Sequence, residues 1–437
     1  MRIICVKFML DIKLIRENPD AVRENLAKRG NLENIAMLDE LIILDKQWRL
    51  KLTHLNNLRH SRKVITVEIA KLKKAGQDTH DQLEKAKEID VQITTIEKQV
   101  IQEETRERNL LLCLPNMLDS TVPFGDDDCG NVQVKTWGTI PVFNFQVKNH
   151  IDLANELDII DMERASKVSG ARFFFLKRQL ALLDLALMSF AMHELSAKGY
   201  AAIMPPLMLN KAAYEGVTAL ADFADVLYKI DGEDLYMIAT SEHPMAAMYM
   251  NEVIKEQDLP LKFAGLSPCF RKEAGVHGKD TRGIFRTHQF NKIEQFVFCK
   301  PEDSVKLHEE LLINSEELLQ KLELPYRVVN VCTGDIGAVA AKKYDIEVWM
   351  PAQNGYREVV SCSNCTDYQA RRLGIRYREK EGAPPKGFLH TLNSTAIATG
   401  RTIVALLENN QNEDGSINVP KVLRKYVGDF EKIGKNL

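Results

Sequence analysis

Arginine, glutamate and glycine residues are concentrated in one segment, SPCFRKEAGVHGKDTRGIFRTHQFNKIEQF at residues 267–296. Its alternating pattern predicts that Arg271 and Glu273 lie on one strand and that Arg286 enters a second, with a glycine-containing loop between them. An arginine beside such a loop can direct its guanidinium at a phosphate, and glycines let the backbone close over a ligand. A surface hairpin with ion pairs would show the same pattern, so the segment alone leaves both interpretations open.

Cysteines offer a second possible chemistry at REVVSCSNCTDYQARR, residues 357–372, where Cys362 and Cys365 form a CxxC. One such pair supplies only two zinc ligands, and no second CxxC or HxxxH follows it. We therefore expect structural cysteines here, with no structural zinc and no redox site. The 8 cysteines are otherwise widely spaced, which favours a reducing compartment over a disulfide framework.

Several nucleotide-binding and metal motifs are absent from the sequence. There is no GxGxxG after a predicted strand, no GxxxxGK[ST] and no HExxH. The HIGH and KMSKS pair of class I aminoacyl-tRNA synthetases is also missing. If the chain uses ATP, it does so with neither a Rossmann fold nor a P-loop.

Two long helices are predicted before these segments. Apolar residues recur every three or four positions between residues 34 and 75, and again from Ala86 to Val100, as in a coiled-coil seam. Gly76 stops the first helix, and Asp78 or Thr79 can cap the second. The two form an antiparallel hairpin in which forty residues of helix reach about 60 Å. A shorter helical pattern precedes them at residues 17–30.

The first helix and the tip of the hairpin carry many basic residues, which suit either a solvated helix face or an arm that contacts phosphates. These residues are Lys51, Arg59, Arg62, Lys63, Lys71, Lys73 and Lys74.

The remaining chain mixes helix and strand patterns. Residues 115–145, rich in proline and acidic residues, are expected to form a linker of turns and no core. An amphipathic helix is predicted at residues 181–198 and a buried helix at 402–409. Antiparallel strands are predicted at residues 264–271 and 283–299.

The formal net charge of −3 shows no overall basic field, which weakens a role in non-specific DNA binding. No stretch approaches the roughly 18–20 apolar residues of a membrane span, and MRIICVKFML is too short and poorly flanked for a signal peptide. We expect a cytoplasmic protein without a membrane partner.

Three segments in order resemble the motifs of class II aminoacyl-tRNA synthetases, in the form of the seryl-tRNA synthetase family. KGYAAIMPPLML at residues 198–209 resembles motif 1, with Pro206 at its proline, and residues 267–296 resemble motif 2 almost completely. HTLNSTAIATGRTIVALLENNQ at residues 390–411 resembles motif 3. The resemblance covers nearly the whole chain from Met9 onward.

The resemblance implies an α+β fold with a catalytic core built on a six- to seven-stranded antiparallel sheet, and a dimer interface at motif 1. It implies an N-terminal tRNA-binding domain at residues 1–115, whose coiled-coil arm spans about residues 34–112. The class II catalytic domain would then occupy residues 116–437.

By resemblance, Arg271 would contact the α-phosphate of ATP and the serine carboxylate, Phe290 would stack on adenine, and Arg401 would contact the γ-phosphate. Arg271 and Arg401 are thus the expected catalytic residues, and no histidine base is required. Expected at the ATP site are Arg271, Lys272, Glu273, Arg286, Thr287, Phe290, Glu358, Val359, Val360, Ser361 and Arg401.

The resemblance also implies a serine pocket. The TxE element at Thr240 and Glu242 would bind the ammonium group, while Glu294 and Thr395 would hold the hydroxyl. The complete set expected there is Thr240, Ser241, Glu242, Arg271, Glu294, Asn393 and Thr395. A buried carboxylate that needs a hydroxyl partner would disfavour alanine.

Residues 357–372 resemble the family's stretch before motif 3, and this resemblance implies that Glu358 and Ser361 bind a Mg²⁺ ion that accompanies ATP. Carboxylate and hydroxyl oxygens with substrate phosphates suit this ion. Asn393-Ser394-Thr395 replaces the family's more frequent NGS, yet keeps a hydroxyl at the last position. The motif 2 loop at residues 276–279 varies in the family and leaves its tRNA contacts undefined.

The resemblance implies a homodimeric serine–tRNA ligase that charges tRNA-Ser, and also tRNA-Sec where one exists. Two alternatives stay open at this stage. An amino acid:carrier-protein ligase would lack the basic hairpin, and a non-catalytic paralogue would be expected to lose motif arginines or pocket carboxylates. A coiled-coil scaffold would explain only the N-terminal part.

Overall fold

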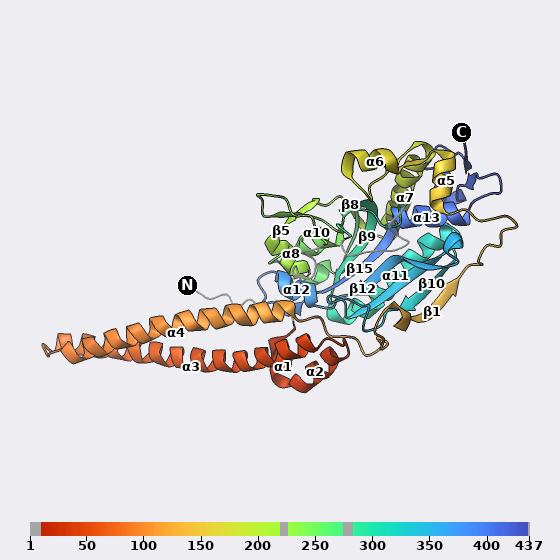
Figure 1. Ribbon diagram of the computed structural model, residues 1–437. Coiled ribbons are helices and arrows are strands. Elements are labelled where there is room, and N and C mark those ends of the chain that lie inside the picture. The colour runs from red at the N-terminus through yellow and green to blue at the C-terminus, as the bar shows by residue number, and fades with distance from the viewer. Residues whose placement is uncertain (1–9, 219–225, 274–282, 436–437) are drawn as a thin grey trace. The chain divides into compact units, whose positions relative to one another are not determined.

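The computed structural model describes residues 10–218, 226–273 and 283–435. Within them the chain divides into two compact units, Leu10–Pro115 and Asn116 onward. Figure 1 labels their elements.

The N-terminal unit is entirely helical. It consists of α1 (Ile12–Glu17), α2 (Pro19–Ala27), α3 (Leu32–Lys74) and α4 (His80–Cys113). Asn31 caps α3 by accepting a hydrogen bond from the backbone N–H of Glu33 at 2.8 Å. Gly76 adopts a positive φ of 66° in the turn, and Thr79 is the N-cap of α4.

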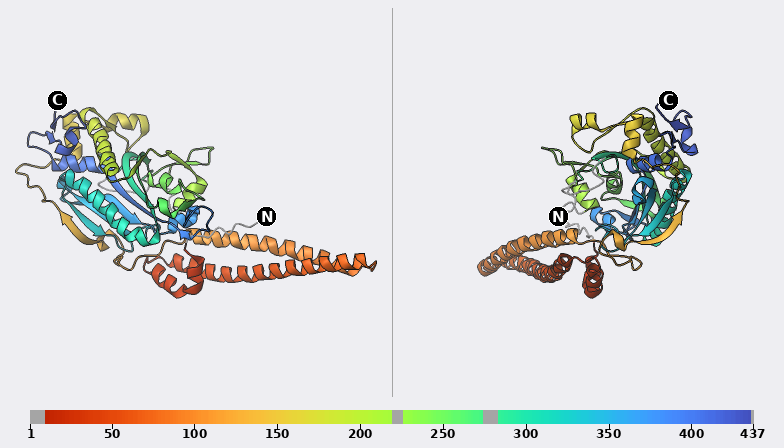
Figure 2. Two further views of the ribbon diagram at one scale, coloured as in Figure 1. Left: turned by 180° about the vertical axis from the view of Figure 1, so that it is seen from behind. Right: turned by 45° about the vertical axis from the view of Figure 1, so that its right-hand side comes forward.

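The predicted coiled-coil hairpin is confirmed. Leu55, Ala86 and Val100 are buried at positions on the predicted seams, and both views in Figure 2 show α3 and α4 side by side. Ion pairs link the helices, including Lys51–Glu103 at 2.5 Å, Arg59–Glu97 at 2.7 Å and Arg62–Asp90 at 2.7 Å.

Eight strands form the main sheet of the second unit, in the order β1-β10-β11-β12-β15-β9-β8-β4. All neighbours pair antiparallel except β4 and β8, which are parallel. In this order the strands are β1 (Val132–Trp137), β10 (Tyr326–Asn330), β11 (Lys342–Met350), β12 (Gly355–Asn364), β15 (His390–Ala398), β9 (Gln289–Cys299), β8 (Leu261–Phe270) and β4 (Ala201–Ile203).

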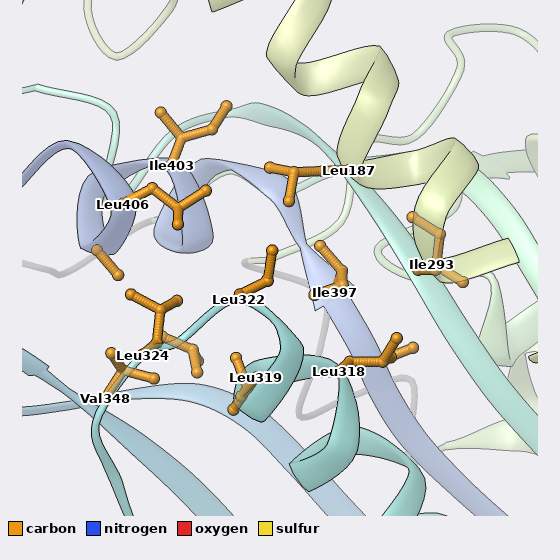
Figure 3. Packing of buried hydrophobic residues seen from close by; sticks show 14 of the residues in the cluster. Leu187, Ile293, Leu318, Leu319, Leu322, Leu324, Val348, Ile397, Ile403 and Leu406 are labelled. Atoms are coloured by element: carbon orange, nitrogen blue, oxygen red, sulfur yellow. The ribbon is translucent and has the colours of Figure 1, made fainter. Parts of the chain in front are cut away.

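Three long helices share a core with this sheet: α7 (Arg178–Ala197), α11 (Ser304–Lys321) and α13 (Thr399–Asn409). Figure 3 shows Leu187 of α7, Leu319 of α11 and Leu406 of α13 packed near side chains of the strands. α7 alone among the described helices has the length and apolarity of a membrane span, but its Leu183, Leu187 and Phe190 are buried in this core. That burial explains its apolar character without a bilayer.

Shorter elements complete the second unit. The helices are α5 (His150–Leu157), α6 (Met162–Ser169), α8 (Lys211–Val217), α10 (Glu242–Ala247), α12 (Tyr368–Leu373) and α14 (Lys421–Arg424). The strands are β2 (Ile160–Asp161), β3 (Phe175–Leu176), β5 (Met208–Asn210), β6 (Leu235–Met237), β7 (Val253–Lys255), β13 (Arg376–Arg378), β14 (Gly387–Phe388), β16 (Ile417–Asn418) and β17 (Lys432–Ile433). Short 3₁₀ turns lie at Asp128–Gly130, Glu256–Asp258, Pro301–Asp303 and Pro351–Gln353.

Some details of the predicted strands are wrong. Arg271 and Glu273 follow the end of β8, and Glu273 turns the chain with a positive φ of 48°. β9 begins at Gln289 and not at Gly283, because Gly283 has a φ of 77° and the next residues form turns. Arg286 therefore precedes the strand.

The region predicted as a linker contributes to the sheet. β1 lies within residues 115–145 and pairs with β10, with a bulge between Gln133 and Lys135. Its residues are mostly exposed, which explains why no apolar pattern predicted it. The sheet accordingly has more strands than the six to seven expected, and β4 makes it mixed.

Candidate active site

A cavity of about 510 Å³ lies beside β9, β12 and β15 in the second unit. The polar residues that line it include Thr240, Glu242, His243, Arg271, Glu273, Arg286, Thr287, Lys292, Glu294, Lys343, Glu358, Ser361, Ser363, Asn393, Thr395 and Arg401. Side chains from the motif 2 and motif 3 segments, from residues 357–372 and from the TxE element therefore meet in one place.

Strand alternation explains how β9 contributes to the cavity. Lys292 and Glu294 line it, whereas Ile293 joins the hydrophobic core. Gln295, on the core side, donates hydrogen bonds to Leu311 O at 3.2 Å and Ser315 Oγ at 3.0 Å of α11. The helix fixes one face of the strand and leaves the other to the cavity.

β-Bulges interrupt this alternation on the strands β12 and β15. Glu358 and Ser361 are three residues apart, a spacing that regular alternation would place on opposite faces. The register of β12 shifts at Val359 opposite the Ile346–Glu347 step, so both side chains line the cavity. A similar shift in β15 follows Thr395.

One part of the cavity gathers cations and aromatic rings. The guanidinium of Arg271 lies 5.3 Å from the ring centroid of Phe290, and its Nε donates to Ala239 O at 3.3 Å. Arg286 Nη1 lies 3.4 Å from Glu273 Oε2. Arg172 Nη1 donates to Glu273 O at 2.6 Å, which supports the left-handed backbone at that residue. An aromatic face beside arginines suits a base joined to phosphates.

Arg401 is held by two kinds of contact. Its guanidinium lies 5.1 Å from the Phe285 ring centroid, while Nη1 donates to Glu358 O at 2.9 Å and Oε2 at 3.1 Å. Arg357 also stacks on Phe285, at 4.6 Å. Partial desolvation opposes the charge of Glu358, whose side chain is 45% exposed, but Arg401 and Lys343 hold the pKa of this carboxyl below its ordinary value. The carboxylate is therefore charged where it faces the cavity.

Carboxylate and hydroxyl oxygens lie together beside Arg401. Asp345 of β11 pairs in register with Ser361 of β12, and its Oδ1 is buried without a hydrogen-bond partner in the described chain. Burial raises the pKa of Asp345 to about 7 despite Lys343, whose Nζ lies 3.5 Å from Oδ2. The oxygen donors of Glu358 and Ser361, with this unsatisfied oxygen nearby, fit a hard cation such as Mg²⁺.

A second part of the cavity contains two carboxylates, the partly buried Glu242 and the buried Glu294. Glu242 Oε1 accepts a hydrogen bond from Gln369 Nε2 at 2.9 Å, and the Glu242 N–H donates to Thr240 Oγ1 at 3.2 Å. Burial raises the pKa of Glu242 to about 7, and Glu294 adds to the rise. Glu294 Oε2 accepts from Thr395 Oγ1 at 3.4 Å and pairs with Lys292 Nζ at 2.5 Å.

Neutral groups complete this region. His243 Nδ1 lies 2.8 Å from Tyr214 Oη, and burial, with Lys292 and Arg271, lowers the pKa of His243 to about 3. Asn393 Nδ2 donates to Cys365 Sγ at 3.5 Å, and burial raises the pKa of the Cys365 thiol. A neutral imidazole and a neutral thiol leave recognition of a charged ligand to the carboxylates and the cations.

Most of the predicted site residues line the cavity, but three do not. Ser241 is fully buried and donates to Gly265 O at 3.1 Å, and Val360 packs in the core. The Lys272 N–H donates to Val226 O at 2.8 Å, and its side chain is not among the lining groups. The motif 2 loop at residues 276–279 lies outside the described residues.

Sequence reasoning missed several lining residues, among them Lys292, Lys343, Ser363 and Cys365. The positions of two of them on the cavity face could have been predicted from strand alternation. Lys292 and Ser363 are each two residues from a predicted site residue on the same strand, Glu294 and Ser361, so alternation alone places them on the cavity face.

Family models match both parts of the chain. Residues 9–118 match the seryl-tRNA synthetase N-terminal domain, and residues 227–410 match the class II tRNA synthetase core domain for G, H, P, S and T.

The similarity to known proteins extends over nearly the full length of this chain. The serine–tRNA ligase of Methanospirillum hungatei is 56% identical, covering 97% of this chain and 100% of that protein, and that of Thermococcus onnurineus is 52% identical, with 97% of each covered. The seryl-tRNA synthetase of Pyrococcus horikoshii, solved with ATP, superposes with a TM-score of 0.94 at 50% identity over 98% of this chain and 99% of that one. The cytoplasmic serine–tRNA ligase of Naegleria fowleri, solved with AMP, has a TM-score of 0.89 at 36% identity over 99% and 100%. With its motif 2 and motif 3 segments gathered at one cavity, the chain belongs to the seryl-tRNA synthetase family of class II aminoacyl-tRNA synthetases.

Proposed function

We propose that this chain works as a serine–tRNA ligase, which activates L-serine with ATP and transfers the seryl group to tRNA-Ser. The observation that carries the proposal is the division of one cavity into two regions. Arginines and Phe290 occupy one region, and the carboxylates Glu242 and Glu294 occupy the other. A nucleotide and a small hydroxy amino acid require these two kinds of surroundings.

In the activation step, the serine carboxylate attacks the α-phosphate of ATP in line with the departing pyrophosphate. A P–O bond to serine forms, the bond to the β-phosphate bridging oxygen breaks, and seryl-adenylate results. The carboxylate is already ionised at neutral pH, so no general base is needed. Arg271 would hold it against the α-phosphate, and charge developing on the phosphate oxygens would be stabilised there.

At the other end of the nucleotide, Arg401 would bind the γ-phosphate and Phe290 would stack on adenine. Glu273 would contact the adenine region, while Arg286 pairs with its carboxylate. Glu358 and Ser361 would hold Mg²⁺, which neutralises phosphate charge when bound with ATP. The Arg401–Glu358 contact keeps the γ-phosphate arginine next to this site.

Serine would be recognised by its three polar groups. Glu242 and Thr240 would receive the ammonium, Arg271 the carboxylate, and Glu294 with Thr395 the hydroxyl. Asn393 lies on the cavity wall beside Thr395. Alanine would leave the Glu294 carboxylate without its partner, a loss that specific hydroxyl-binding sites use for discrimination.

In the transfer step, a terminal ribose hydroxyl of the tRNA attacks the serine carbonyl. The new ester bond forms as the bond to AMP breaks, and the departing phosphate takes the hydroxyl proton. This route needs no histidine base, in keeping with the low pKa of His243.

The α3–α4 hairpin would serve as the tRNA-binding arm, within a tRNA-binding domain at residues 1–115, and residues 116–437 would form the catalytic domain. Lys63, Lys71, Lys73 and Lys74 are exposed, and no ion pair within the described hairpin occupies them. Free lysines near the tip can contact phosphates without reading bases. The same arm would accept tRNA-Sec where one exists.

We also infer a cytoplasmic homodimer. Exposed apolar side chains lie before and within motif 1: Leu182 and Leu185 of α7, then Met204, Leu207 and Met208 of the motif. Exposed apolar side chains of this kind favour association with another copy. The relative from Naegleria fowleri is named as cytoplasmic, which supports this location.

Neither alternative explains the chain as well. A carrier-protein ligase has no use for the basic hairpin. A non-catalytic paralogue would not be expected to retain Arg271, Glu294, Glu358 and Arg401 around one cavity.

The proposal is tested by incubating the purified chain with radiolabelled serine, ATP, Mg²⁺ and a tRNA-Ser transcript. We expect serine to become acid-precipitable with the transcript. A transcript that lacks the long variable arm serves as the control and should be charged poorly. No charging of the intact transcript by folded protein would contradict the proposal.

A further inference from the structure

Lys292 lies inside the serine region of the cavity, yet the division of roles above gives it none. Its side chain is only 8% exposed, and that of Glu294 only 2%. Because the two residues alternate with Ile293 on β9, both face the cavity. A buried lysine needs a compensating charge, and Glu294 supplies it at 2.5 Å.

Within the described residues, the ion pair and the hydrogen bond of Glu294 both use the same carboxylate oxygen. Lys292 Nζ and Thr395 Oγ1 both approach Oε2, at 2.5 and 3.4 Å. No hydrogen bond within the described part of the chain uses Oε1. The ion pair therefore orients the carboxylate and leaves one oxygen available to a ligand in the cavity.

The surrounding charges leave Lys292 as the partner of this carboxylate. Glu242 and Glu294 are the acidic groups of the region, with Arg271 and Lys292 as its cations and His243 neutral. The thiols of Cys269 on β8 and Cys362 on β12 are buried, and burial raises their pKa values, so they stay neutral. When Arg271 engages the substrate carboxylate, Lys292 is the cation that remains for Glu294.

We propose that Lys292 is a positioning residue for serine selection, whose ammonium holds Glu294 as a charged acceptor directed at the substrate hydroxyl. The inference rests on the proposed function, because it assigns the hydroxyl of serine to Glu294. A carboxylate without this partner would turn away or take up a proton, since an unpaired buried charge is strongly disfavoured. In either case the hydroxyl would lose its acceptor, while the rest of the ligand would keep its contacts.

The test compares two non-hydrolysable adenylates, seryl-sulfamoyladenosine and alanyl-sulfamoyladenosine, whose dissociation constants are measured by calorimetry. In Lys292→Met we expect binding of the seryl compound to weaken roughly 10- to 100-fold, the range for a lost hydrogen bond to a charged group. The alanyl compound has no hydroxyl and should change less than threefold. Lys292→Arg keeps the charge and should restore most of the seryl preference.

Two further variants separate positioning from folding. Lys292→Gln is a second neutral replacement, for use if the methionine variant does not fold, and the same loss of preference is expected. Lys262→Met is the matched control, because it breaks another strand lysine–glutamate pair, Lys262–Glu310 at 2.7 Å, outside the cavity. It should bind both compounds as the wild type does.

The outcomes are distinct. A seryl-to-alanyl preference that stays within twofold of wild type in the neutral variants would overturn the inference. So would an equal loss of both compounds, which would mean that Lys292 contacts the common carboxyl or phosphate region. Failure of the wild type to prefer the seryl compound would instead contradict the proposed function.

Discussion

Glu242, proposed to bind the serine ammonium, has a pKa that burial raises. Its carboxyl lines the same cavity as Glu294, and burial, with the charge of Glu294, raises its pKa to about 7. The raised value means that the neutral form predominates below pH 7, whereas the proposed binding of the serine ammonium requires the ionised form.

We therefore predict that the KM for serine falls about tenfold between pH 6 and pH 8, because the ionised fraction of a group with a pKa near 7 rises by about that factor. Serine-dependent ATP–pyrophosphate exchange at several pH values measures it. In Glu242→Gln the pH dependence should disappear along with most of the affinity. A serine KM in the wild type that does not change with pH would contradict the role given to Glu242.

Glu358 and Ser361 give the corresponding prediction for the metal. Glu358→Gln retains the shape of the side chain and removes its charge, so the Mg²⁺ concentration that gives half-maximal exchange should rise at least tenfold. Adding EDTA to the wild type should abolish exchange, and Mg²⁺ should restore it. An unchanged Mg²⁺ requirement in the variant would remove Glu358 from the metal site.

At the scale of elements, the sequence predicted the parts that depend on local pattern. The seams of α3 and α4 and the stop at Gly76 follow from helical periodicity and glycine conformation. β1 was missed because an exposed edge strand has no buried face to impose alternation. The late start of β9 was missed because the turn after Gly283 is fixed by tertiary contacts, such as the approach of His150 to Gly283.

The candidate site, like the fold, could be predicted only in part from the sequence. The resemblance to the family named Glu358 and Ser361, in the stretch before motif 3. Alternation alone would separate them, and the bulge at Val359 brings them to one face. Bulges leave little trace in a single sequence. Lys343 depends on register with β12, which a single sequence also does not specify. Lys292 was within reach, since it lies two residues before Glu294.

The hairpin offers a prediction that separates binding of tRNA from chemistry. Replacing Lys71, Lys73 and Lys74 together with alanine should raise the KM for tRNA. The slope of log K for tRNA binding against log salt concentration should become less steep by about 0.7–0.9 for each lost phosphate contact. Exchange with serine should not change, because the cavity lies in the other unit.

The matched control for these lysines is the double variant Arg62→Ala with Asp90→Ala. It removes an ion pair of the hairpin without altering net charge, so tRNA binding should be nearly unaffected. Equal effects of the triple and double variants would indicate a general loss of hairpin structure instead of lost phosphate contacts.

At the scale of the whole molecule, the exposed apolar surface around motif 1 predicts self-association. Sedimentation should give a mass of twice the 49.6 kDa of the chain. Leu185→Arg places a charge on a leucine that is 57% exposed in the single chain, and it should shift the protein toward monomer. Val305→Arg, at an exposed valine of α11, is the control. A monomeric wild type at micromolar concentration would contradict the dimer.

The central claim is that one cavity activates serine and no other amino acid. The most direct measurement is ATP–pyrophosphate exchange with Mg²⁺, run with each of the twenty amino acids, for the wild type and Glu294→Ala. We predict exchange with serine alone, reduced at least a hundredfold in the variant, since the hydroxyl acceptor is gone. Exchange with alanine or glycine in place of serine, or no exchange from folded wild-type protein, would contradict the claim.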